Sequence, residues 1–125
     1  MIEKVAFTMY PVENVERARA FYENILGLRP GNEVSPASKW VEYDLPGGGC
    51  LAITNVVPGA KPSDVAGGTI ALEVDDLDAQ VKALESRGVT IKMAPLETPV
   101  CWMAAIGDSE GNGILLHQLK NKKRA

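Results

Sequence analysis

The chain has 125 residues, of which 46% are hydrophobic and 23% are charged, and its formal net charge is −3. A chain of this size and composition builds a core of its own, which excludes an intrinsically disordered protein. Four of the 13 basic residues lie in the tail at 120–125, and the rest of the chain lacks the basic face that nucleic-acid binding requires. No apolar run approaches the ~20 residues that cross a bilayer, and no secretory pattern is present, so we expect a cytoplasmic protein without nucleic-acid or membrane partners.

The first predicted elements follow one another from a β-rich run at residues 7–12. Asn14 is a suitable N-cap for a helix over residues 15–26, and Gly27 is placed to end that helix in a left-handed conformation. Strands are predicted near residues 28–34, at 38–45 and at 50–56, with a glycine-rich turn at 46–49 between the last two. The first half therefore reads β-α-β-β-β.

The second half repeats this order 62 residues later. A β-rich run at 69–74 leads to Asp76, the predicted cap of a helix over residues 77–87, and Gly88 ends the helix. Strands are predicted near 89–93, at 100–106 and at 113–119, with a turn at 108–112. The sequence thus predicts a single domain made of two modules, about 1–57 and 68–119, with a linker at 58–67 and a basic tail at 120–125.

Three segments carry a family resemblance. They are PVENVERARAFYENILGL at residues 11–28, IALEVDDL at 70–77 and DSEGNGI at 108–114. In order and spacing they resemble the vicinal oxygen chelate superfamily, which includes glyoxalase I, extradiol dioxygenases and bleomycin-resistance proteins. The resemblance implies an α+β fold in which two tandem β-α-β-β-β modules form a curled, cup-shaped mixed sheet, with the helices on its outer face. It also implies a homodimer, in which the cup forms within one chain or across two.

The resemblance also implies where a divalent metal would be bound. Motif matching places the four ligand positions at Phe7, Ala52, Thr69 and Leu115. A catalytic metal such as zinc needs about three protein donors, and these side chains do not supply them. We therefore expect no metal and no cofactor. A relocated site that uses His117, Glu42 and Glu73 is the alternative.

Strand alternation and the resemblance together predict which side chains line the cup. A tight turn at 46–49 would place Tyr43 on the same face as Cys50, Ala52 and Thr54, while Trp40 and Trp102 would face the helices. In another register either tryptophan would enter the cup. The predicted ligand-binding residues are Phe7, Met9, Tyr43, Cys50, Ala52, Thr54, Thr69, Glu73, Cys101, Met103, Leu115 and His117.

These residues predict a metal-free protein that binds a largely apolar or aromatic small molecule. One alternative is a glyoxalase-like lyase or isomerase with a relocated metal, or with Glu73, Tyr43 and His117 in acid–base roles. A second alternative is a structural or accessory subunit whose cup has closed. Both cysteines, Cys50 and Cys101, are expected to be free thiols.

Overall fold

The computed structural model describes residues 1, 3–33 and 39–120, and it divides into two compact units, Met1–Pro62 and Ser63–Ala125. Each unit contains a four-stranded mixed sheet and a helical segment, so the predicted α+β class and the two tandem modules are confirmed. The boundary between the units lies inside the stretch predicted as a linker. Of the predicted basic tail, only Lys120 lies within the described residues.

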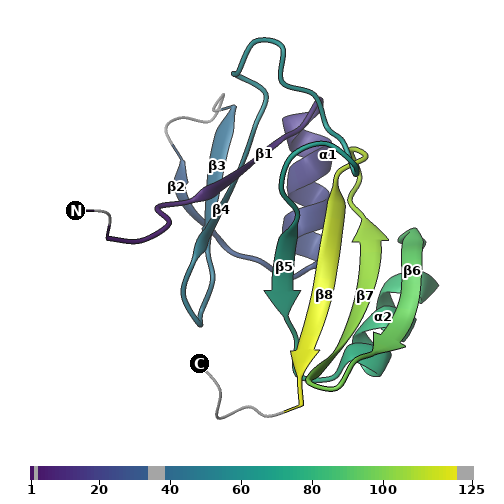
Figure 1. Cartoon of the computed structure of the whole chain (residues 1–125). Coiled ribbons are helices and arrows are strands. Elements are labelled where there is room, and N and C mark those ends of the chain that lie inside the picture. Colours follow the sequence, from purple (N-terminus) through teal and green to yellow (C-terminus); the bar gives the residue numbers. More distant parts are fainter. Residues whose placement is uncertain (2, 34–38, 121–125) are drawn as a thin grey trace. The chain divides into compact units, whose positions relative to one another are not determined.

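The first unit forms a sheet in the order β1-β4-β3-β2, with β1 parallel to β4 and the other neighbours antiparallel (Figure 1). Its elements are β1 (Thr8–Pro11), α1 (Val15–Arg19), η1 (Ala20–Ile25), β2 (Pro30–Glu33), β3 (Trp40–Asp44) and β4 (Cys50–Thr54). The parallel pair is possible because the helical segment separates β1 from the remaining strands.

The helix of the first unit begins and ends as its sequence predicts. The Asn14 side chain accepts a hydrogen bond from the Arg17 N–H at 2.9 Å. The segment beyond Arg19, η1, is a π-helix rather than the expected α-helix, and the Leu26 N–H therefore donates to the Phe21 carbonyl, five residues earlier. Gly27 follows with φ of 75°, a conformation that glycine adopts without steric cost.

Aromatic packing joins this helical segment to its sheet. The rings of Tyr22 and Tyr43 stack with centroids 6.0 Å apart, and both side chains are fully buried. The Tyr43 hydroxyl donates to a Glu23 carboxylate oxygen at 2.9 Å, and the same oxygen pairs with Arg19 at 2.7 Å. Because Tyr43 points toward the helix, its side of the sheet is the helix face, and we call the other side the helix-free face.

The second unit repeats the topology, with the strand order β5-β8-β7-β6 and β5 parallel to β8. Its elements are β5 (Ile70–Glu73), α2 (Leu77–Ser86), β6 (Ile91–Glu97), β7 (Cys101–Gly107) and β8 (Gly113–Leu119). Each helix packs against strands of its own sheet, α1 against β4 and α2 against β6, β7 and β8. Figure 1 labels these elements.

The second helix packs an aliphatic stripe against its sheet. Asp76 caps the helix by accepting the Ala79 N–H, and Gln118 of β8 accepts the Leu77 N–H at 2.7 Å. Gln118 therefore lies on the helix face of this sheet. The buried contact residues are Leu77, Val81 and Leu84 from the helix and Ala104, Ile106, Ile114 and Leu116 from the strands.

Candidate functional site

The helix-free face of the second sheet gathers most of the residues predicted for that unit. His117 of β8 pairs with Glu73 of β5 on one side and with Met103 of β7 on the other. Cys101 and Leu115 lie two residues along the same strands, and alternation places them on this face. The shared face predicted for these residues is therefore confirmed. Trp102 pairs with Gln118 and lies on the helix face, as predicted.

A pocket of about 340 Å³ opens in the second unit. Thr69 and Leu115, two of the predicted ligand-binding residues, line it. The remaining lining residues are Asp64, Lys92, Ala105, Ile106, Gly113 and Ile114. Its walls are thus mostly aliphatic or glycine, with charged side chains at Asp64 and Lys92, which is the composition typical of a small-molecule site.

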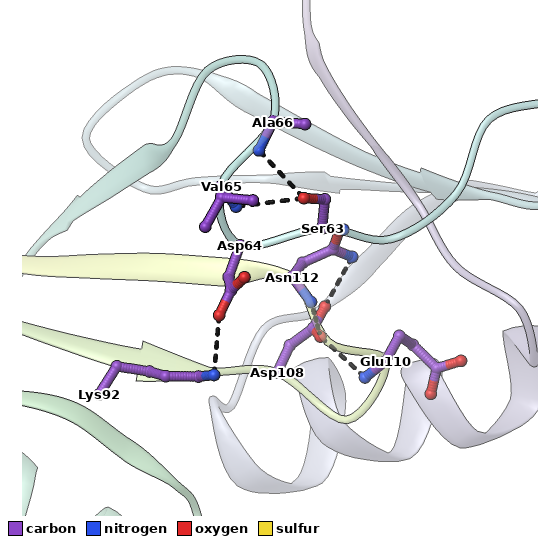
Figure 2. Close-up of polar contacts among 8 residues, drawn as sticks. All are labelled: Ser63, Asp64, Val65, Ala66, Lys92, Asp108, Glu110 and Asn112. Atoms are coloured by element: carbon purple, nitrogen blue, oxygen red, sulfur yellow. Dashed lines mark hydrogen bonds and ion pairs between the residues drawn. The ribbon is translucent and has the colours of Figure 1, made fainter.

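Residues 63–66, which we call the strap, pass beside the turn between β7 and β8 (Figure 2). The buried Asn112 side chain accepts the Ser63 N–H at 3.1 Å and donates to the Asp108 carboxylate at 3.0 Å. The Ser63 hydroxyl in turn accepts the N–H groups of Val65 and Ala66. These bonds hold the strap in the second unit, although the sequence predicts these residues as part of the linker.

An ion pair and a glycine bring the strap close to the sheet. Lys92 Nζ lies 2.8 Å from Asp64 Oδ2 (Figure 2). The hydrogen bond from Lys92, and then its positive charge, lower the pKa of the Asp64 carboxyl below its usual value. A Cβ at Gly113 would lie 3.3 Å from the Asp64 Cβ, which is tighter than an ordinary contact, so glycine at this position permits the approach.

The turn sequence at 108–112 has two roles, one of which the sequence predicts. Asp108 Oδ1 accepts the N–H groups of Glu110 and Asn112, both at 2.8 Å, so this acid shapes the turn that the sequence predicts at 108–112. The hydrogen bond from the Ser63 N–H to the Asn112 side chain was not predicted, because the two residues are 49 positions apart. An amide with two donors and an acceptor is the only signal that could have suggested it.

Glu73 and His117 form a direct side-chain contact that sequence spacing did not predict. Glu73 Oε1 lies 2.6 Å from His117 Nδ1, and Glu73 Oε2 accepts the Leu119 N–H at 2.8 Å. The two residues are 44 positions apart, and only the parallel register of β5 with β8 places them opposite each other. The protein's one histidine therefore has a carboxylate partner, an arrangement used for proton acceptance and for orienting a ring.

The face predicted for Tyr43 in the first unit is wrong. In the β3–β4 ladder, Ala52 pairs with Glu42, whereas Tyr43 pairs with Leu51 on the helix face. The turn includes Leu45, so Asp44 instead stands opposite Cys50, and this one-residue shift reverses the face of every β3 side chain. Tyr43 is fully buried against the helix and does not share a face with Cys50, Ala52 or Thr54.

The same shift moves Trp40 to the helix-free face, opposite to the face first predicted and as the alternative register predicts. Trp40 pairs with Thr54, and its Nε1 donates to Glu42 at 2.8 Å. The Phe7 ring meets the Trp40 ring edge to face, with centroids 5.3 Å apart. Met9 pairs with Ala52 on this face, so an aromatic and thioether surface lies beside a carboxylate.

Neither thiol is part of a disulfide. Partial burial, then the charges of Glu42 and Asp44, raise the pKa of the Cys50 thiol, which reduces its thiolate fraction at neutral pH. Cys101 is buried, and its sulfur lies 3.1 Å from the Thr98 hydroxyl.

The residues at the four motif-derived metal positions do not form a donor set. Phe7, Ala52 and Leu115 carry no donor atom, and Thr69 offers one hydroxyl. Within residues 1, 3–33 and 39–120, no cluster of three or more histidine, cysteine, aspartate or glutamate side chains is arranged to hold a metal ion. The superfamily's metal chemistry therefore has no matching ligands at these positions.

Residues 4–116 match the sequence profile of the Glyoxalase/Bleomycin resistance protein/Dioxygenase superfamily, and the chain belongs to this superfamily. No functionally curated protein matches the sequence. Neither helix in the described part of the chain has the length and apolar character needed to cross a membrane.

Solved structures extend this comparison. TnmS3, an antibiotic-binding protein from Streptomyces sp. CB03234, is 28% identical with a TM-score of 0.80, and the match covers 95% of this chain and 98% of TnmS3. A superfamily member from Sphaerobacter thermophilus is 29% identical over 94% and 98% of the two chains, with a TM-score of 0.76. Lactoylglutathione lyase from Agrobacterium tumefaciens shares the fold at 16% identity, over 94% of each chain, with a TM-score of 0.72.

Proposed function

We propose that this chain is a metal-free small-molecule-binding protein that holds a largely apolar or aromatic ligand. The observation that carries the proposal is the pocket of about 340 Å³ in the second unit, lined by Thr69 and Leu115. This volume falls within the range of ligand pockets, which begins near ~300 Å³. The similarity to the antibiotic-binding protein TnmS3 supports the same reading.

Residue chemistry supports the metal-free part of the proposal. Leu115 lies in the pocket wall at a position where the resemblance implies a metal ligand, and it offers only apolar surface. Metal binding to a folded protein raises its melting temperature. A thermal-shift measurement with Ni²⁺, Mn²⁺ or Zn²⁺ should therefore show no rise that a chelator reverses, and such a rise would contradict this part.

The expected partners follow from the same proposal. We expect a small-molecule ligand and a second copy of the chain, in the cytoplasm. The edge strands of both sheets give a physical reason for pairing, because exposed edges are usually covered. Sedimentation equilibrium would test the dimer, and a monomer at all concentrations would contradict it.

An acid–base enzyme is the second candidate function, and the contact between Glu73 and His117 favours it. A histidine held by a carboxylate is the usual arrangement of a general base. Tyr43 does not take part in this candidate, because it is buried on the helix face. If the chain catalyses a reaction, Glu73→Gln should abolish turnover, whereas a binding protein would lose affinity at most.

A substitution in the pocket tests the binding proposal. We expect that a screen of planar aromatic compounds, both cationic and anionic, will contain at least one compound that stabilises the wild-type chain against heat. A ligand at a hundred times its Kd contributes about 2.7 kcal/mol to stability. Leu115→Arg should fill the pocket and remove this stabilisation.

Val100→Arg is the matched control. Val100 is 52% exposed and does not line the pocket, so this variant should keep the ligand response. Melting temperatures without ligand would show whether both variants fold. A screen in which no compound stabilises the wild-type chain, or in which Leu115→Arg responds as the wild type does, would contradict the proposal.

A further inference from the structure

We propose that Glu73 holds His117 in the tautomer whose Nε2 accepts a hydrogen bond, and that the ligand is therefore a molecule with an acidic hydroxyl, such as a phenol or an enol. This inference rests on the proposed binding function and adds the chemical class of the ligand. It concerns one side-chain pair on the helix-free face of the second sheet.

Both oxygens of the Glu73 carboxylate have partners within the second sheet. Oε1 meets His117 Nδ1 at 2.6 Å, and Oε2 accepts the backbone N–H of Leu119 at 2.8 Å. A backbone amide fixes the second oxygen, so the carboxylate cannot turn away from the imidazole without losing that bond. Glu73 is therefore a positioning residue, and its orientation is set by the strands.

The chemistry of the contact decides the tautomer. An ionised carboxylate only accepts hydrogen bonds, so the proton between Glu73 and His117 belongs to Nδ1. A neutral imidazole carries a single N–H, which leaves Nε2 with a lone pair. The structure gives Nε2 no hydrogen-bond partner within the described residues.

The surroundings of His117 favour an organic ligand over an ion. Met103 stands opposite His117 on β7, and Leu115 lies two residues earlier on β8 with the same orientation. The His117 side chain keeps 26% of its surface exposed, so its ring is accessible from the helix-free face. An apolar surface with one acceptor fits an aromatic body that carries a hydroxyl.

The charges balance if the hydroxyl is acidic enough to give up its proton. The proton moves from the ligand oxygen to Nε2, the ligand becomes an oxyanion, and His117 becomes an imidazolium between that oxyanion and the Glu73 carboxylate. Ethers of the same shape cannot make this bond, because they carry no proton. The site should therefore discriminate between a phenol and its methyl ether.

The first test reads the tautomer directly in the ligand-free protein. The chain has a single histidine, so long-range ¹H–¹⁵N correlation spectra of the imidazole report His117 alone. At a pH about two units above the ordinary histidine value of ~6.5, we expect an N–H signature at Nδ1 and a lone-pair signature at Nε2. A dominant N–H at Nε2 would overturn the inference.

Two carboxyl variants show whether Glu73 sets this state. Glu73→Gln should weaken the Nδ1–H preference, because an amide can either donate or accept. Glu97→Gln is the matched control: Glu97 is exposed on β6, pairs with Lys120, and should leave the His117 spectrum unchanged. Equal spectra for the wild type and Glu73→Gln would also overturn the inference.

The second test compares 2-naphthol with 2-methoxynaphthalene by equilibrium dialysis. We expect the wild-type chain to bind the naphthol at least tenfold more tightly, and His117→Leu to remove that preference while retaining the methoxy compound. Equal binding of both compounds by the wild type would overturn the hydroxyl inference and leave the binding function standing. Binding of neither compound would count against both.

Discussion

The two units have the same strand order but different chemistry between helix and sheet. In the first unit, stacked tyrosines and a Glu23 carboxylate that accepts a buried hydroxyl fill this interface. In the second unit the interface is aliphatic, with Leu84 among the buried residues of α2. The first helix also contains a π-helical segment, whereas α2 is regular. The two units therefore share their strand order and helix caps, while the side chains packed between helix and sheet differ.

The helix-free faces differ as well, and this difference bears on function. The face of the first sheet presents Trp40, edge to face with Phe7 and hydrogen-bonded to Glu42. The face of the second sheet presents the Glu73–His117 pair. The two modules thus present an aromatic surface in the first unit and a carboxylate–histidine pair in the second.

The largest expected effect comes from removing one large side chain from each interface. Tyr22→Ala should lower the free energy of unfolding by about 3–5 kcal/mol, as for other large aromatic residues, and Leu84→Ala by about 2–5 kcal/mol. Because Tyr22→Ala also removes the stack on Tyr43, we expect the larger loss there. Urea unfolding followed by circular dichroism measures both, and a larger loss for Leu84→Ala would contradict the contrast.

The anchoring of the strap is a feature of the second unit, and Asn112→Ala should break it. The substitution removes the acceptor of the Ser63 N–H and one donor to Asp108, which should cost about 1–3 kcal/mol. Amide hydrogen exchange at Ser63 should accelerate at the same time. Ser109→Ala, an exposed change in the same turn, should stay within about 0.5 kcal/mol. Unchanged exchange at Ser63 would show that the strap is held in another way.

A smaller effect is expected from the buried hydroxyl of the first unit. Tyr43→Phe keeps the stacked ring and removes the hydrogen bond to Glu23, so it should cost about 1 kcal/mol. Ile106 occupies the corresponding position of the second unit, because it pairs with Ile114 of β8 as Tyr43 pairs with Leu51 of β4. Ile106→Val is therefore the matched substitution. Its cost should be about 0.5–1.5 kcal/mol, from lost packing alone. A neutral Tyr43→Phe would mean that the bond adds no net stability.

The smallest expected effect concerns the exposed ion pair of the strap. Lys92 lowers the pKa of Asp64, so this pair contributes stability above the unfolded pKa of aspartate and loses it as the pH falls through the lower folded value. NMR titration should place the Asp64 pKa below that of an isolated aspartate, and Lys92→Met should raise it toward the ordinary value. Equal titration in both proteins would contradict the assigned cause.

Local signals in the sequence predicted most elements of the fold. Asn14 and Asp76 cap their helices, and Gly27 and Gly88 end them in left-handed conformations, as expected. These signals succeed because a cap or a helix stop depends on a few neighbouring residues. The π-helical segment over Ala20–Ile25 was not predicted.

The candidate site was less predictable, because it depends on register. The turn before Cys50 contains one residue more than predicted, which places Tyr43 on the helix face and Trp40 on the helix-free face. The strand and turn propensities of these residues do not indicate such a shift of register. Glu73 and His117 were both predicted to bind ligand, yet their contact depends on a parallel pairing across 44 positions. Strand alternation and the resemblance placed Glu73 and His117 on one face, and they did not report that the two side chains touch.

The placement of the two tryptophans gives each unit its own optical reporter. Trp40 lies in the first unit with its N–H on a carboxylate, and Trp102 lies in the second with the Lys120 ammonium 4.9 Å from its ring centroid. Single-tryptophan chains made with Trp40→Phe or Trp102→Phe would therefore emit from one unit at a time. If the two emission changes coincide during denaturation, the modules unfold together; if they separate, each module is a cooperative unit.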